Sequence, residues 1–78
     1  MKQYRIQADW DAETRVWTAT SEDVPGLVIE AETLDALVDE AKLLVPDLLE
    51  LNCGLRGPMD VSLVMTVHRE ECIVIPAA

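Results

Sequence analysis

The chain is predicted to fold as a single α+β domain, with three strands, one helix and a fourth strand in chain order. Three observations predict this order: alternating polar and apolar residues at the start, a Pro-Gly turn at residues 25–26, and a long stripe of apolar residues at helical spacing from Leu34 to Leu49. The length of 78 residues suits one domain, residues 1–78. The helix is expected to pack on one face of the sheet.

The first two strands are expected to form an antiparallel hairpin. Apolar residues alternate with polar ones from Tyr4 to Trp10, which is the pattern of a strand with one wet face. Residues 11–14 are typical of a loop, and a second strand starts near Arg15. The expected pairs are Trp10 with Arg15, Ala8 with Trp17, and Ile6 with Ala19. This register places both tryptophans on the apolar face, whereas a slip by one residue would expose Trp17.

A turn at Pro25-Gly26 is expected to lead into a short third strand, residues 27–31. Proline presets φ at a turn corner, and glycine accepts a positive φ at the next position. Thr33 is then expected to cap the helix. Pro46 removes one helical hydrogen bond and is expected to kink the helix or to split it in two. The helix is expected to stop at residues 52–54, where Gly54 is free to become left-handed.

Residues 61–68 alternate again and predict the fourth strand. Short connections favour the sheet order 3-2-1-4, with the fourth strand parallel to the first through a right-handed crossover. The third and fourth strands then lie at the edges, which invite pairing with another chain. The second face of the sheet is only half polar. A homo-oligomer is therefore expected. Residues 72–75 are expected to form either a short fifth strand or an arm that reaches another subunit.

The charge balance excludes some partners. There are 15 acidic residues against 6 Lys and Arg, giving a formal net charge of −9. Such a surface repels nucleic acid and anionic membranes and favours a basic partner. There is no apolar run long enough for a membrane span and no signal peptide, so a cytoplasmic location is expected. Cys53 and Cys72 are too far apart for a metal knuckle and are expected to be buried, reduced thiols.

The order of these features resembles the HicB-like antitoxin superfamily, in particular a small stand-alone branch of unknown function. The resemblance rests on four features: the first strand at Tyr4-Arg5-Ile6, Trp17 and Ala19 of the second strand, the turn Asp23-Val24-Pro25-Gly26, and Thr33-Leu34 at the helix start. A Pro-Asp-Leu-Leu-Glu-Leu-Asn stretch, residues 46–52, is also similar to that branch. The resemblance covers about residues 4–67.

The resemblance implies a partial ribonuclease-H-like fold that binds rather than cuts. Relatives of this type bind a small basic ribonuclease toxin, the HicA type, and block its active site. They usually add a C-terminal DNA-binding module, and none is expected in this chain. The alternative is a stand-alone homo-oligomeric domain with a small-molecule or structural role.

No catalytic, cofactor-binding or metal-binding residue is expected, and no cofactor. A ribonuclease-H-type site needs several carboxylates around two cations. Asp9 is expected on the wet face opposite Val16, where the fourth strand adds no carboxylate. His68 lacks a third ligand nearby, and Ser21 lacks the Gly-x-Ser-x-Gly context of a nucleophile. The protein is therefore expected not to be an enzyme.

The candidate partner-binding residues form two acidic patches and one aromatic anchor. Asp11 and Glu13 lie in the first loop, and Glu22 and Asp23 lie before the Pro-Gly turn at the opposite end of the hairpin. Either patch is suited to a basic partner. Trp10 is expected to pack beneath the helix, or to anchor an interface if it overhangs the end of the sheet.

Overall fold

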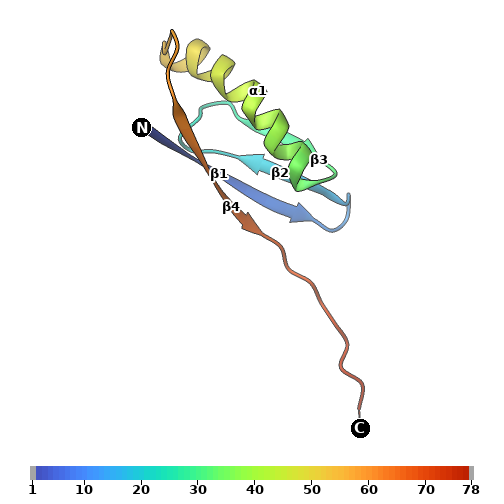
Figure 1. Cartoon of the computed structure of the whole chain (residues 1–78). Coiled ribbons are helices and arrows are strands. Elements are labelled where there is room, and N and C mark those ends of the chain that lie inside the picture. Colours follow the sequence, from blue (N-terminus) through green and yellow to red (C-terminus); the bar gives the residue numbers. More distant parts are fainter. Residues whose placement is uncertain (1, 78) are drawn as a thin grey trace.

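A computed structural model describes residues 2–77. The elements are β1 (Lys2–Asp11), β2 (Val16–Thr20), β3 (Val28–Ala31), α1 (Leu34–Cys53) and β4 (Val61–His68). They form one four-stranded sheet of order β3-β2-β1-β4, with α1 across one face (Figure 1). The pairs β1–β2 and β2–β3 are antiparallel, and β1–β4 is parallel. The predicted α+β fold and its 3-2-1-4 order are confirmed.

The core lies between α1 and one face of the sheet. The helix contributes four buried residues one turn apart: Leu37, Ala41, Val45 and Leu49. This spacing places them on a single side of the helix. The sheet contributes inward-facing residues that alternate along the strands, as the sequence predicted: Tyr4, Ile6, Ala8, Trp17, Ala19 and Ile29. Val24 and Leu27 of the turn close one end of this core.

The hairpin register differs from the prediction by two residues. Trp10 pairs with Trp17, and Ala8 pairs with Ala19. The loop occupies residues 12–15 rather than 11–14, because Arg15 takes a left-handed conformation (φ 59°) and its N–H donates to the Asp11 carbonyl at 2.8 Å. Since the error is an even number, every side chain stays on its predicted face. Asp9 consequently faces Thr18 instead of Val16.

The Pro-Gly turn has the predicted geometry. Gly26 has a φ of 86°, and the Leu27 N–H donates to the Val24 carbonyl at 3.2 Å. A positive φ at the third position and proline at the second define a type II turn, which glycine accepts without strain. Because the turn includes Leu27, β3 begins one residue later than predicted, at Val28.

Helix α1 begins and ends where the sequence predicted. The Thr33 hydroxyl accepts from the Ala36 N–H at 3.1 Å, and Gly54 is left-handed with a φ of 68°. The helix continues through Pro46, so a split into two helices is excluded. Pro46 costs one hydrogen bond, but the buried residues Ala41 and Leu49 attach the helix to the core on both sides of it. No helix within the described residues is long and apolar enough to cross a membrane.

Beyond β4 the chain runs away from the domain (Figure 1). Residues 69–77, here called the arm, contain no helix or strand, so the predicted fifth strand is wrong for this chain by itself. The radius of gyration is 15.7 Å, whereas about 11.5 Å is expected for a compact chain of this length. Both cysteines are exposed, in contrast to the prediction. Cys53 lies at the open end of α1 and Cys72 lies on the arm, where nothing covers either thiol.

Candidate functional site

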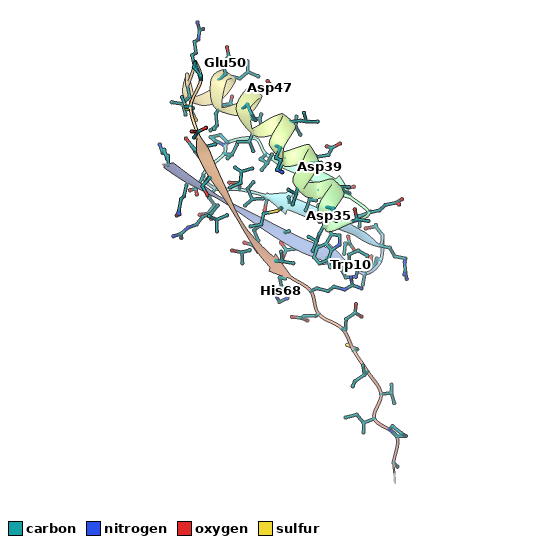
Figure 2. All side chains as sticks on the ribbon, in the orientation of Figure 1. Trp10, Asp35, Asp39, Asp47, Glu50 and His68 are labelled. Carbon is teal, nitrogen blue, oxygen red and sulfur yellow. The ribbon has the colours of Figure 1, made fainter. Side chains whose placement is uncertain are left out.

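Trp10 is held at the end of the sheet by two contacts. Its ring packs against Trp17 with a centroid distance of 5.3 Å and an interplanar angle of 57°. The Arg69 guanidinium lies 4.2 Å from the centroid of the Trp10 ring, and 5.7 Å from that of Trp17. Figure 2 shows Trp10 beside the end of β4, close to His68. A guanidinium over an indole is a favourable cation–π contact. Trp10 is therefore half-buried, at the margin of the core and beneath Arg69, which the sequence did not single out.

The carboxylate of Asp11 organises the hairpin loop. One of its oxygens accepts from the Glu13 N–H at 3.0 Å and the Thr14 N–H at 3.4 Å. This is the local turn that an aspartate side chain builds with the backbone two and three residues on. Glu13 is exposed, and no hydrogen bond or ion pair within residues 2–77 engages its carboxylate. Of this pair, Glu13 is the residue available to a partner.

The Ser21–Asp23 loop replaces a missing strand pair. β2 ends at Thr20, opposite Gln7, so β1 continues past its antiparallel partner. The backbone of Arg5 is instead satisfied by side chains: its N–H donates to Asp23 Oδ2 at 2.8 Å, and its carbonyl accepts from the Ser21 hydroxyl. The same hydroxyl accepts from the N–H groups of Asp23 and Val24 at 3.1 Å each. Asp23 and Ser21 thus hold the loop against β1.

The two predicted acidic patches are separate in the fold. The second patch is attached to β1 at Arg5, and the first lies at Asp11 on the same strand. These two residues are six positions apart, which corresponds to about 20 Å along the strand. Glu22 is exposed beside Asp23, and no hydrogen bond to its carboxylate occurs within the described part of the chain. The loop borders a polar hollow of about 440 Å³ on the uncovered face of the sheet, lined by Arg5, Gln7, Thr20, Glu22 and Thr66 among others.

A third acidic surface lies on the solvent side of α1. Figure 2 shows Asp35, Asp39, Asp47 and Glu50 along the helix, on the side away from the sheet. Glu40 is also exposed on this helix, and Lys42 is its one cation. The sequence already showed these acidic residues on the side of the helix opposite its apolar stripe. They were not predicted from it to form a binding surface.

The chemical groups considered for catalysis are not assembled into a site. Asp9 lies opposite His68 in the parallel pairing, on the uncovered face, and accepts from the Gln7 amide at 3.3 Å. His68 Nε2 lies 3.1 Å from Glu70 Oε1, and both side chains are exposed. No group of three or more potential metal ligands occurs among residues 2–77. The Ser21 hydroxyl is engaged by backbone groups on both sides.

Comparisons with known proteins identify a family without assigning an activity. No curated protein matches the chain. A hypothetical protein, TTHA1013, from the extremely thermophilic bacterium Thermus thermophilus has a similar crystal structure, with a TM-score of 0.78 and 40% sequence identity. The match covers 92% of this chain and 100% of that one. The model of a domain of unknown function, DUF1902, matches residues 3–75. The chain therefore belongs to the DUF1902 family.

Proposed function

We propose that this domain is a non-catalytic protein-binding module that sequesters a small basic protein, in the manner of the HicB antitoxins that its sequence resembles. The partner is a ribonuclease of the HicA type, and inhibition is steric and electrostatic. The observation that supports the proposal most directly is the charge on the solvent-exposed side of α1, which carries five carboxylates and a single lysine. Glu13 and Glu22 add acidic groups at the two ends of the hairpin.

Charge on this scale contributes more to association rate and partner choice than to affinity. An exposed ion pair contributes only about 0–1 kcal/mol. A field from many like charges, however, speeds the approach of an oppositely charged partner and falls steeply with salt. Because screening acts over about 10 Å at 0.1 M salt, binding through the face of α1 weakens as salt rises.

The first test is a low-salt affinity purification of the tagged protein from its native host, with bound proteins identified by mass spectrometry. The proposal expects one small basic protein in stoichiometric amount, released by salt. The purified pair then enters an RNA-cleavage assay, in which added domain should suppress cleavage. A basic partner whose RNase activity is unaffected by the domain, or no basic partner at all, contradicts the proposal.

Neutralising variants locate the docking face. Asp39→Asn with Asp47→Asn removes two charges from the exposed side of α1 and touches no core residue. The matched control is Glu30→Gln with Glu32→Gln, which removes the same charge from exposed positions on and after β3. The proposal expects slower association for the helix variant only. Asp11 and Asp23 are unsuitable for this purpose because their carboxylates hold loops.

The alternative function is a stand-alone oligomer that binds a small molecule. The observation that favours it is the polar hollow of about 440 Å³, where Arg5 offers a cation next to Thr20 and Thr66 hydroxyls. Purification that recovers only the protein itself, as a defined oligomer, supports this alternative. A Thr66→Tyr variant, which would fill the hollow, should then abolish ligand-induced thermal stabilisation without lowering the melting temperature of the free protein.

A further inference from the structure

The edge of the sheet formed by β4 lacks any protection against pairing. Within the described residues β4 pairs only with β1, so its other side presents unpaired backbone groups. Residues 61–67 contain no charged side chain and no proline. Natural proteins usually guard such an edge with lysine, proline, a bulge or a covering segment. An uncharged, β-branched edge strand is instead suited to receiving another strand.

An apolar groove runs along the same edge. The helix packs over β2 and β3, so the inward side chains of β4 are only half covered. The resulting groove has a volume of about 590 Å³. It lies between α1 and β4 and is lined mainly by Val38, Ala41, Val45, Leu63 and Met65. A strand added beside β4 would direct alternate side chains into this groove.

The arm carries side chains that fit the groove. Ile73, Val74 and Ile75 are 82%, 93% and 82% exposed, and all three are β-branched. Figure 1 shows the arm continuing roughly in the direction of β4, away from the domain. Arg69 lies on the side of the sheet that faces the helix, over Trp10. If the alternation of β4 continues along the arm, Ile73 and Ile75 fall on that same side as Leu63 and Met65.

We propose that two copies of this chain exchange arms, each arm pairing antiparallel with the β4 edge of the other copy. Ile73 and Ile75 then enter the groove between α1 and β4 of the second copy. In this arrangement β4 and the arm form one long strand, which pairs antiparallel with the same strand of the other copy. The two-fold axis that relates the copies lies near His68. The two sheets thereby join, and the unprotected edges disappear.

Side-chain direction restricts the register. Residues directly opposite each other in an antiparallel pair point to the same face, so inward Ile73 must face an inward residue of β4. A two-fold axis at His68 pairs Ile73 with Leu63 of the second copy and Cys72 with Val64 of the second copy. A shift of the axis to Arg69 would place two arginines directly opposite each other, which is unfavourable.

A second copy suits this edge because most of the contacting residues are uncharged. Arg69, Glu70 and Glu71 pair close to the axis, opposite the uncharged residues 65–67 of the second copy. Residues 61–67 and 72–77 contain no ionisable group except the thiol of Cys72, so pairing does not bring the acidic surfaces of the two copies together. The exposed side of α1 is left open in this arrangement. The arm exchange is therefore independent of the proposed function, and either can fail without the other.

A disulfide trap tests the register directly. In a Cys53→Ser background, Val64→Cys is combined with the native Cys72. Within one extended chain these positions are eight residues apart, about 26 Å, which is far beyond the reach of a disulfide. Mild oxidation should therefore give a covalent dimer on a non-reducing gel. The controls are the same variant with Cys72→Ser, and Ser62→Cys in place of Val64→Cys; both should trap far less dimer.

Molar mass in solution provides the second measurement. Size-exclusion chromatography with light scattering should give twice the 8.7 kDa of one chain. Ile73→Glu with Ile75→Glu should reduce this to the mass of one chain, with unchanged circular dichroism. The matched control is Val28→Glu, an exposed β-branched residue on the opposite edge, which should remain dimeric. A monomeric native protein, a trap that closes only within one chain, or a dimer lost in Val28→Glu but kept in the arm variant overturns the inference.

Discussion

Replacing Asp23 with alanine should destabilise the domain, although the side chain is exposed. Its carboxylate accepts the Arg5 N–H at 2.8 Å, at the point where β2 no longer pairs with β1. Without it, that N–H loses its partner, and the loop loses one of its two attachments to β1. The domain has a net charge of −9, so removal of one negative charge reduces self-repulsion and favours folding slightly. A loss of stability therefore cannot come from the change in net charge.

The magnitude follows from the type of bond. A hydrogen bond to a charged group contributes about 1.5–3 kcal/mol, and access of water to this exposed pair places the cost of Asp23→Ala near the lower end, about 1–2 kcal/mol. In a domain of this size each 1 kcal/mol lowers the melting temperature by roughly 4–8 °C. Asp23→Ala should therefore melt roughly 5–15 °C below the native protein.

The assay is thermal and urea denaturation followed by circular dichroism, with Glu22→Ala as the matched control. Glu22 precedes Asp23 in the same loop and carries the same charge, but its carboxylate makes no hydrogen bond among the described residues. Its replacement should change stability by less than about 0.5 kcal/mol. Equal melting temperatures for the two variants would refute the assignment of Asp23 to the loop attachment.

Three further predictions concern the turn, the core and the helix cap. Gly26→Val should lower the free energy of unfolding by more than about 1 kcal/mol, because a β-branched residue is strained at φ 86°. Steric overlap is not the reason, since no neighbouring atom lies closer than 3.4 Å to the added Cβ. An unchanged melting temperature would contradict the turn geometry. Leu37→Ala should cost about 2–5 kcal/mol in urea denaturation, since Leu37 is fully buried, and a cost under about 1 kcal/mol would mean that the helix packs elsewhere. Thr33→Ala should cost about 0.5–2 kcal/mol and Thr33→Ser far less, because the hydroxyl bonded to the Ala36 N–H at 3.1 Å is kept in serine; equal losses would point to a role other than capping.

The hairpin shows how far a pattern of polar and apolar residues can define a strand pair. Alternation determines which face each side chain occupies, and on this point the prediction for Trp17 is confirmed. It does not determine the register, because registers two residues apart share the same faces. The pairing of Trp10 with Trp17 depends on Arg15 adopting a left-handed conformation, for which arginine has no special preference.

Two of the candidate partner-binding residues have structural tasks that sequence reasoning missed. Asp11 and Asp23 were singled out for their charge, yet in the structure their carboxylates accept hydrogen bonds from backbone N–H groups. An aspartate in a turn often has this role, so Asp11 was recognisable from its position. Asp23 was not, because its partner Arg5 is 18 residues away in the chain and meets it only in the folded sheet. Glu13 and Glu22 keep the exposure that partner binding requires.

The amino-acid sequence by itself determined the element order, the sheet order, the helix ends at Thr33 and Gly54, and the division between apolar and polar faces. These depend on local preferences and on periodicity, which are properties of neighbouring residues. Only the tertiary structure decided the hairpin register, the attachment of Asp23 to Arg5, the Arg69 contact over Trp10 and the open groove beside β4. The hairpin register depends on the left-handed conformation of Arg15, which the residue type does not predict. The other three depend on residues far apart in the chain, whose meeting is a consequence of the packed sheet rather than of any local pattern.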